Sequence, residues 1–427
     1  MRYESAYARK LFREIFLKGR NPSCSNQSSS NPAREFEAQL MEVQKKKPVQ
    51  ILASIRGRRV CMEQGLEQIA KELKLPATGF RYFPFVALEC DSKEAERVCA
   101  YLKKRFPWMR YVSLARTLYI PELLPGMGGF PVSQKLHQRR GEAWNLELIG
   151  ANIANQTTQG RGVKVGIIDT GVDYTHEEVE KRFGKVKGYN FVDNTEDPYD
   201  GNGHGTHVAG IVAGKEVGVA SACELYAIKV LSDEGYGSEA DVLRGIEWAI
   251  DNKLEVINMS LGSSQYSYFE DQVIQEAYKR GMVIAAAAGN EYYGPSYPAA
   301  LENVIAVAAV DRNKDHAEFS NIYRTNDISA PGVSIYSSVP GGYQEFSGTS
   351  MATPHITGCM ALARSLDKKE PAELEKLMKE TAEDLGSSSD PNNEEKYGAG
   401  LVRTDELVES LSGKAWKNAP IQEVRFG

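Results

Sequence analysis

The sequence lacks a dense cysteine framework, an excess of basic residues and any long apolar run. Six cysteines are spread over 427 residues without a CxxC pair, a usage that agrees with a reducing compartment. The formal net charge is -6, and no basic domain emerges that would indicate nucleic-acid binding. No stretch approaches the ~18 consecutive apolar residues of a membrane span. These absences exclude nucleic acid and membrane as expected partners.

The first residues of the sequence also lack the pattern of a secretory signal peptide. The first twenty residues are interrupted by charges such as Arg13 and Lys18. They contain no uninterrupted apolar run of the length that a signal peptide needs. We therefore expect a cytoplasmic protein, with export by another route left open.

Composition and periodicity divide the chain into five parts. The first is an extension rich in Ser, Asn and Pro, which cannot bury a core and is expected to be flexible. A small domain, a Pro- and Gly-rich linker, a large domain and a tail follow. The predicted bounds are 1–47, 48–121, 122–142, 143–410 and 411–427.

The small domain alternates strand and helix patterns. Strands are predicted at Val49–Ile55 and Phe80–Leu88, and a last extended segment or pair at Met109–Ile120. A helix is predicted at Met62–Leu73, and a second one opens at Asp91, which with Glu94 resembles a capping box. The order β-α-β-α-β suits an α+β, ferredoxin-like unit with two helices on one face of an open antiparallel sheet.

The large domain shows short, nearly continuous apolar runs separated by amphipathic helices. Such runs are typical of strands buried on both faces of a parallel sheet. The predicted strands are Val163–Ile168, Leu225–Leu231, Val256–Met259, Val283–Ala288 and Val304–Val310, and the predicted helices are Glu239–Asn252, capped by Ser238, and Phe269–Arg280. Strands alternating with helices predict a doubly wound, mostly parallel α/β fold.

Ligands of such a sheet lie beyond the carboxyl ends of its strands. Asp169 follows one predicted strand and Asn290 follows another, so both are expected at the active edge.

Ser350 lies where a Gly-containing segment runs into a helical pattern. Pro354 follows it, and proline is favoured only in the first turn of a helix. A serine at a helix N-terminus is most often a cap. It can also attack a carbonyl while its own N–H stabilises the oxyanion.

Three motifs carrying polar residues occur in the order Asp, His, Ser. They are Val165-Gly-Ile-Ile-Asp169-Thr-Gly171, Asp200-Gly-Asn-Gly-His204-Gly-Thr-His207 and Gly348-Thr-Ser350-Met-Ala-Thr-Pro354. Ser260-Leu-Gly262 and Ala287-Ala-Gly-Asn290 lie between them. With these motifs, residues 143–410 resemble the subtilisin-like serine proteases, which use this order of catalytic residues. More weakly, residues 48–121 resemble the inhibitory pro-domain of that family.

The resemblance implies a role for each matching residue. Ser350 would be the nucleophile, His204 the general base and Asp169 the residue that orients His204. Asn290 would donate its amide to the oxyanion together with the Ser350 N–H. The edges and walls of the cleft would be Ser260, Leu261, Gly262, Ala287, Ala288, Gly289 and, at its rim, Glu291.

Other roles remain open for some of these residues. Asp169 alone fits a turn or a metal ligand. His204 and His207 have an i, i+3 spacing that zinc ligands use, although no Cys or carboxylate pair completes a site. His355 neighbours Ser350 but does not face it on a helix, so we interpret it and His207 as structural.

No cofactor is required by this chemistry, and calcium is the one ion that the resemblance suggests. Gly214–Val219 is too short for the main calcium loop of the family, and the matching acid is Glu178 rather than Asp, so we expect that site to be absent. A weaker cation site maps to Ala299, Leu301, Val304 and Asp327, of which only Asp327 offers a carboxylate.

The resemblance favours an intracellular serine endopeptidase made as a self-inhibited zymogen. Its partners would be protein or peptide substrates and its own pro-domain, 48–121. Autocleavage is expected in the linker, near Pro121 or after Arg139 or Arg140. The family default is cleavage after large apolar residues, while Glu291 would favour a basic one. The alternatives are a pseudoprotease that only binds, and a small domain that only assists folding or docking.

Overall fold

The structure is a computed structural model. It describes residues 49–55, 69, 72–106, 109–121, 143–387 and 389–413. The predicted extension and linker, and most of the predicted tail, lie outside these residues. Among the residues described, no helix has the length and apolar character needed to cross a membrane.

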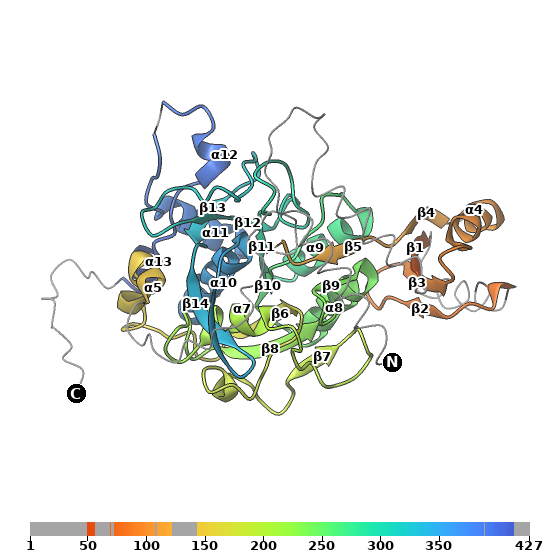
Figure 1. Cartoon of the computed structure of the whole chain (residues 1–427), viewed down its shortest axis with the longest axis horizontal. Coiled ribbons are helices and arrows are strands. Elements are labelled where there is room, and N and C mark those ends of the chain that lie inside the picture. The colour runs from red at the N-terminus through yellow and green to blue at the C-terminus, as the bar shows by residue number, and fades with distance from the viewer. Residues whose placement is uncertain are drawn as a thin grey trace, which may run out of the picture.

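A seven-stranded sheet forms the centre of the large domain (Figure 1). Its strand order is β13-β12-β11-β10-β6-β8-β7, and all neighbouring pairs are parallel. The strands are β6 Lys164–Asp169, β7 Gly188–Asn190, β8 Glu224–Lys229, β10 Val256–Met259, β11 Val283–Ala287, β12 Ile305–Val310 and β13 Ile328–Pro331. The predicted doubly wound α/β fold is confirmed. Only the short edge strands β7 and β13 were not predicted, because three or four residues carry too little pattern.

Helices cover both faces of this sheet. In β6, Val165 and Ile167 pack into a core shared with α7 and α10, whereas Ile168 packs into a second core shared with α8 and α9. The helices of the domain are α5 Trp144–Leu148, α6 Ala151–Ala154, the 3-10 helix η2 Glu180–Arg182, α7 His204–Ala213, α8 Glu239–Asp251, α9 Tyr268–Lys279, α10 Thr349–Leu366, α11 Pro371–Glu380, α12 Asn393–Tyr397 and α13 Thr404–Ser412. Because α13 runs to Ser412, the predicted domain boundary at 410 is two residues short.

The two predicted helices α8 and α9 start at serine caps. Ser238 Oγ accepts the Ala240 N–H at 3.3 Å, as predicted. Ser267 Oγ accepts the N–H groups of Phe269 and Glu270. Both helices match their predicted bounds within one residue, and their N-termini face the small domain, so these caps also shape the surface on which that domain sits.

The small domain is a four-stranded antiparallel sheet with the order β2-β3-β1-β4. Its elements are β1 Val49–Ile55, β2 Ala77–Gly79, β3 Phe85–Cys90, α4 Ala95–Arg105 and β4 Met109–Leu114. β1 is found as predicted. Most of the predicted helix Met62–Leu73 lies outside the described residues, although Ile69, Glu72 and Leu73 are helical.

Two predictions for the small domain were wrong in detail. The strand predicted from Phe80 begins only at Phe85, because the preceding residues turn to contact α8: the Tyr82 N–H donates to Glu247 Oε1 at 2.9 Å. The capping box at Asp91 does not form. Asp91 Oδ1 accepts the Lys93 N–H within a turn, and α4 begins later, after Glu94.

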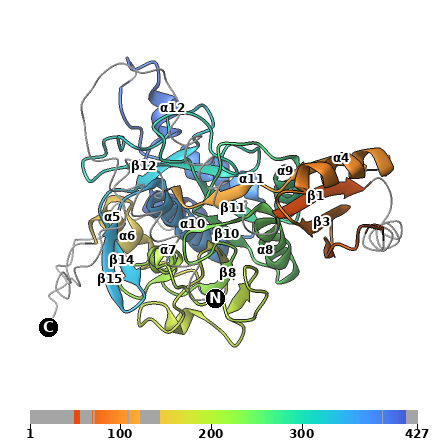
Figure 2. The same cartoon turned by 45° about the vertical axis from the view of Figure 1, so that its right-hand side comes forward.

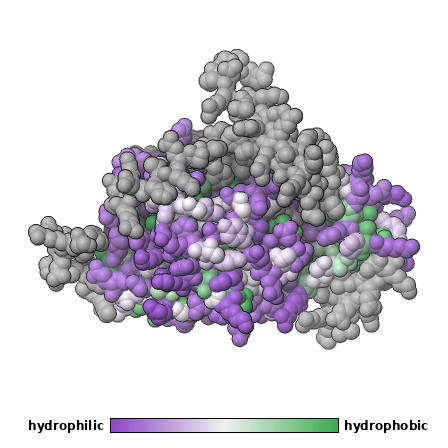
Figure 3. All heavy atoms as spheres, turned by 60° about the horizontal axis from the view of Figure 1, so that its bottom comes forward, coloured by the Kyte–Doolittle hydropathy of each residue, from purple (hydrophilic) through white to green (hydrophobic). Residues whose placement is uncertain are grey.

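A short strand, β5 (Thr117–Tyr119), leaves the small sheet and pairs with β9 (Tyr236–Ser238) of the large domain. Figures 1 and 2 show β5 lying on the large domain, apart from the other strands of its own domain. A hairpin of β14 (Ile335–Val339) and β15 (Gly342–Phe346) flanks α7. On the face seen in Figure 3, the described residues are mostly hydrophilic and hydrophobic ones form small separate patches.

Candidate active site

Asp169 and His204 form the centre of the site. Asp169 is the last residue of β6 and His204 the first of α7. Asp169 Oδ1 lies 2.8 Å from His204 Nδ1, and both side chains are fully buried. A carboxylate can only accept here, so Nδ1 carries the proton and Nε2 is the nitrogen able to take one up. The sequence prediction that these two residues work as a pair agrees with this contact.

Glycine lets α7 approach the end of β6 this closely. A Cβ on Gly205 would lie 2.0 Å from the Gly171 carbonyl oxygen. The Gly205 N–H donates to Thr170 Oγ1 at 3.0 Å, and the Thr170 N–H donates to Asp169 Oδ1 at 2.7 Å. The Gly-rich motif around His204 is therefore a steric requirement of the Asp169–His204 contact.

Asp200 holds the turn that precedes His204, a role that the sequence prediction missed. Its Oδ1 accepts from Thr170 Oγ1 and from the N–H groups of Asn202 and Gly203, each at 2.9 Å. Its Oδ2 accepts from the Thr206 N–H and hydroxyl. Burial raises the pKa of Asp200, while these hydrogen bonds act to lower it. The sequence signal for this role was that Asp200 lies within the His204 motif.

Ser350 is the second residue of α10 and is fully buried, which confirms the predicted helix start. Pro354, predicted in the first turn, is the sixth residue of the helix. A residue there normally donates its N–H to the carbonyl four residues earlier, and proline has no N–H. The Ser260 hydroxyl donates to the Ser350 carbonyl at 2.9 Å in its place.

A chain of hydrogen bonds fixes the Ser260 hydroxyl. Thr357 Oγ1, on α10, donates to Asn258 Oδ1 at 2.9 Å, and Asn258 Nδ2 donates to Ser260 Oγ at 2.8 Å. This chain orients Ser260 toward Ser350, whose own Oγ lies 3.4 Å from the Ser260 carbonyl oxygen. Asn258 and Thr357 were not singled out from the sequence, because neither lies in one of the motifs.

Asn290 has a defined orientation beside Ser350. Its Oδ1 accepts from the Thr349 N–H at 3.0 Å and from the Thr349 hydroxyl at 2.8 Å. A backbone N–H can only donate, so the accepting atom is the amide oxygen and the NH₂ group is assigned to the other position. Thr349 Oγ1 in turn accepts the Gly289 N–H at 3.2 Å. These contacts fit the predicted role of Asn290 as an amide donor.

Two backbone segments form the predicted edges and walls. Ser260, Leu261 and Gly262 follow β10, and the chain pairs there with β5 through Gly262 and Tyr119. Ala287 ends β11, and Ala288 and Gly289 follow it, all three in buried positions. Gly289 has a φ of +101°, and a Cβ there would lie 2.5 Å from Glu291 Oε2. That same Glu291 oxygen accepts from Asn321 Nδ2 at 2.6 Å, so Glu291 is placed against Gly289.

The two histidines interpreted as structural are both bound by protein groups, His207 at Nε2 and His355 at both ring nitrogens. His207 Nε2 lies 3.0 Å from the Ile335 carbonyl, and burial lowers the pKa of His207 to about 3. His355 lies between the Met351 carbonyl, 2.9 Å from Nδ1, and Asn145 Nδ2, 2.8 Å from Nε2. Burial lowers the pKa of His355 to about 4. In the described part of the chain, no group of three or more His, Cys, Asp and Glu is placed to hold a metal ion.

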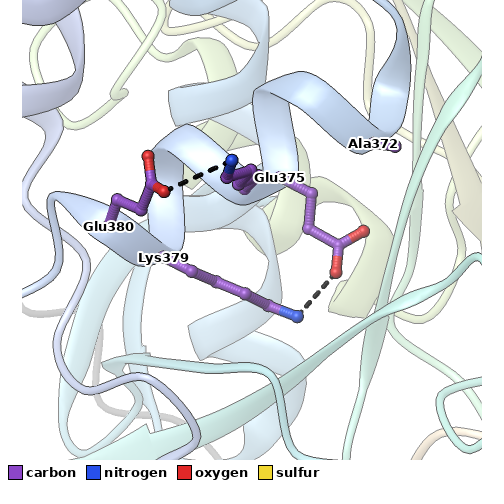
Figure 4. A pocket seen from close by; sticks show the side chains of 5 residues that line it. Ala372, Glu375, Lys379 and Glu380 are labelled. Carbon is purple, nitrogen blue, oxygen red and sulfur yellow. Dashed lines mark hydrogen bonds and ion pairs between the residues drawn. The ribbon is translucent and has the colours of Figure 1, made fainter.

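The two acidic residues considered for cation sites, Glu178 and Asp327, bind protein groups. Glu178 accepts the Glu216 N–H at Oε2 and the Tyr343 hydroxyl at Oε1. Asp327 accepts the Ala306 N–H at Oδ2 and the Lys379 ammonium at Oδ1, 2.7 Å away. Figure 4 shows Lys379 on α11 also bound to Glu375. Donors and an ammonium at these oxygens do not fit a calcium ion, which needs them as ligands.

A buried Asp–His pair lies at the carboxyl edge of the parallel sheet, and Ser350 opens α10, the helix that packs against α7. This arrangement is typical of α/β serine hydrolases. The model of the subtilase family matches residues 160–400. Over 275 residues the chain is 42% identical to Subtilisin DY of Bacillus licheniformis, covering 61% of this chain and 97% of that protein.

It is 40% identical over 274 residues to Subtilisin Savinase of Lederbergia lenta, with the same coverage of 61% and 97%. Subtilisin E of Bacillus subtilis is 42% identical over 264 residues, covering 58% of this chain and 66% of that protein. The chain belongs to the subtilase family and is a subtilisin-like serine endopeptidase.

Proposed function

We propose that Ser350 attacks the peptide carbonyl and forms an acyl-enzyme, with His204 as the general base. The hydrogen bond between Asp169 and His204 carries this proposal, since it fixes the tautomer that leaves Nε2 able to take the serine proton. The Ser350 N–H and the Asn290 amide would bind the oxyanion. The test is digestion of a peptide library by the wild type and by Ser350→Ala. Equal cleavage by the two proteins would contradict the assignment.

The competing function is a pseudoprotease that binds through its groove without hydrolysis. Intact Asp169, His204, Ser350 and Asn290 argue against it, although fold alone does not establish activity. A fluorophosphonate probe separates the two, because it labels only an activated serine. Labelling of the wild type freed of residues 48–121, but not of Ser350→Ala, supports the enzyme, and absence of labelling in both supports the pseudoprotease.

We further propose that residues 48–121 hold the enzyme as a self-inhibited zymogen. Tyr119 exchanges two backbone hydrogen bonds with Gly262, at 3.1 and 2.9 Å, while β5 pairs with β9 on its other side. The Ile120 N–H donates to the Gly235 carbonyl at 3.0 Å. A strand held between two edges in this way has the geometry of a bound substrate.

The register of this strand bears on the processing bond. Tyr119 and Gly262 form an antiparallel bridge, and continuing it by two residues sets Pro121 opposite Ser260, next to the nucleophile. Proline has no N–H to donate to the Ser260 carbonyl, which favours a strand that stays bound over one that is cut quickly. The alternative processing sites after Arg139 and Arg140 lie outside the described residues.

Contacts away from the strand support the same proposal. The ring centroids of Phe85 and Phe269 lie 5.0 Å apart, and Tyr111 stacks on Tyr268 at 3.9 Å. These pairs join the small domain to α9 by apolar contact, which stabilises the bound state beyond the strand alone.

The test adds isolated 48–121 to the processed enzyme and follows peptide hydrolysis. Sub-micromolar inhibition, with a new N-terminus within 120–143 that is missing from Ser350→Ala, supports the zymogen. No inhibition, with a fully active uncut chain, supports a folding aid or docking module.

Location and specificity complete the proposal. We propose a cytoplasmic protein, in agreement with the free thiols of Cys90, Cys99, Cys223 and Cys359. Recovery of the native protein from the medium rather than the cell would contradict it.

Cleavage after large apolar residues is the family default, and Glu291 favours a basic residue instead. The same peptide library ranks the two.

A further inference from the structure

Arg116 directly precedes β5 and is buried between the N-termini of α8 and α9. Only 8% of its side chain is exposed. Its Nη2 lies 2.7 Å from Glu270 Oε2, and its Nε lies 3.4 Å from Glu239 Oε1. Its Nη1 donates to the Gln265 carbonyl. A single guanidinium thus joins two carboxylates and one carbonyl of the large domain.

The backbone of Arg116 is bound as well. Its N–H donates to Glu239 Oε2 at 3.0 Å, and its carbonyl accepts the Glu239 N–H at 2.9 Å. Any residue placed here could make these two bonds, except that proline lacks the N–H. The selective part of the contact is therefore the side chain. Arginine supplies the guanidinium, and the ammonium of lysine would be a weaker substitute.

The two glutamates belong to the catalytic domain and are built into it. Glu239 is the first residue of α8 and Glu270 the third of α9, where the positive end of a helix dipole stabilises a carboxylate. Their side chains are 1% and 0% exposed with Arg116 in place. Glu270 Oε1 has no hydrogen-bond partner among the described residues, so one acceptor of this buried side chain remains for a further donor.

Charge and burial oppose each other at this pair. Burial raises the pKa of Glu270, and Arg116 acts to lower it. Burial alone would lower the pKa of Arg116, but Glu270 and Glu239 outweigh it and raise that pKa. Removing a cation from two buried carboxylates is costly unless another cation or water replaces it. When the small domain leaves, the pair becomes a site that a basic side chain would fill.

The position of Arg116 relates this pair to a substrate. Arg116 lies three residues before Tyr119, the residue that pairs with Gly262 as a substrate residue would. A substrate bound between the same two edges would place the residue that corresponds to Arg116 beside Glu239 and Glu270. We propose that Glu239 and Glu270 form a specificity subsite for an arginine or lysine side chain located three residues before the substrate residue that pairs with Gly262. This rests on the proposed function of residues 48–121 as a substrate-like inhibitor.

The test uses the full chain after it has completed its own processing. Quenched fluorescent peptides keep Thr117-Leu-Tyr-Ile120, carry Pro121→Phe, and present Arg, Lys, Gln or Glu at the position of Arg116. We expect kcat/KM to fall in that order, with Arg about tenfold to a hundredfold above Gln, because charged hydrogen bonds in a partly buried site are strong. Mass analysis confirms that all four peptides are cut at one bond.

Variants assign the preference to the two acids. Glu270→Gln and Glu239→Gln should each bring the Arg to Gln ratio close to one. Glu276→Gln is the matched control, since it removes the same charge from a partly exposed position of α9 that pairs with Arg280, and it should keep the ratio. The ratio of kcat/KM for the Arg and Gln peptides is measured on the wild type itself. The proposal therefore stays testable even if a variant folds poorly.

The outcomes are distinguishable. Equal kcat/KM for the Arg and Gln peptides, with normal cleavage of both, would overturn the subsite and leave the peptidase intact. A ratio that survives Glu270→Gln and Glu239→Gln together would also overturn it. Absence of cleavage of every peptide would overturn the proposed function and the subsite with it.

Discussion

The surroundings of Ser350 and the surface that carries the small domain are built differently. Ser350, His204 and Asn290 make short hydrogen bonds within the large domain, to Ser260, Asp169 and Thr349 respectively. The small domain sits on α8 and α9 through aromatic rings and the buried charges around Arg116. The difference indicates that the small domain can leave without disturbing the catalytic geometry. A zymogen that processes itself needs this property, because its catalytic residues must be in place before the cleavage.

The largest effect is expected for Asp169→Asn. The asparagine would present an NH₂ group to His204 Nδ1 and favour the tautomer in which Nε2 already carries a proton, so Nε2 could not take one from Ser350. We expect kcat to fall by about 10⁴ with an unchanged fold. Asp173→Asn, which alters a buried aspartate of the same loop, should retain most activity. Comparable losses in the two variants would indicate damage to the loop instead.

Asn290→Ala removes the second proposed oxyanion donor. We expect kcat to fall about 10²–10³-fold with little change in KM, a range measured in subtilisin, a member of this family. Thr349→Val removes the hydroxyl that anchors Asn290 Oδ1 and should cost less. If KM rises while kcat stays constant in Asn290→Ala, the residue acts in substrate binding and the assignment is wrong.

Tyr111→Ala tests the docking surface. Loss of its stacking on Tyr268 should weaken inhibition by isolated 48–121 by about threefold to tenfold. Tyr101→Ala is the control, because Tyr101 is similarly exposed but lies on α4 beside Phe106 of its own domain. An equal effect of both changes would mean that general loss of stability, not docking, reduces inhibition.

Ser260 and Pro354 should be energetically coupled. Ser260→Ala leaves the Ser350 carbonyl without its hydroxyl donor and should lower the free energy of unfolding by about 0.5–1.5 kcal/mol. In a Pro354→Ala background the restored N–H can serve that carbonyl, so the same change should cost less. Unfolding of the four proteins, each carrying Ser350→Ala, completes the cycle. Additive costs would show that the two donors are not alternatives.

Calcium should have the smallest effect. Glu178 and Asp327 already bind protein donors, so an ion that binds neither site adds nothing to the stability of the folded state. The Tm of the Ser350→Ala protein should be the same in calcium and in chelator. A Tm that rises steeply with micromolar calcium would contradict this account.

The proposed catalytic residues could be predicted because their chemistry requires local sequence patterns. His204 needs Gly205 beside it to approach Asp169, and Ser350 needs a helix start, so both leave a mark within a few residues. The parallel strands were predictable for a related reason, since burial on both faces gives continuous apolar runs.

The contacts between the domains could not be predicted in the same way. Arg116 binds Glu239 and Glu270 across 123 and 154 residues of sequence, and neither glutamate lies in a motif. The apolar character of Phe80–Leu88 predicts a strand, but its first residues turn to meet α8 and the strand begins at Phe85. Pro354 can be the sixth residue of α10 because the Ser260 hydroxyl supplies the missing donor, and Ser260 follows β10, far away in the sequence.

The most direct test of the account follows fluorophosphonate labelling of the full chain during its own processing, with the adduct mapped by mass. We predict a single adduct on Ser350 that is almost absent from the intact chain and grows as residues 48–121 are removed. Rapid labelling of the intact chain would contradict the inhibited state. A processed protein without an adduct, or with one on another residue, would contradict the catalytic role of Ser350.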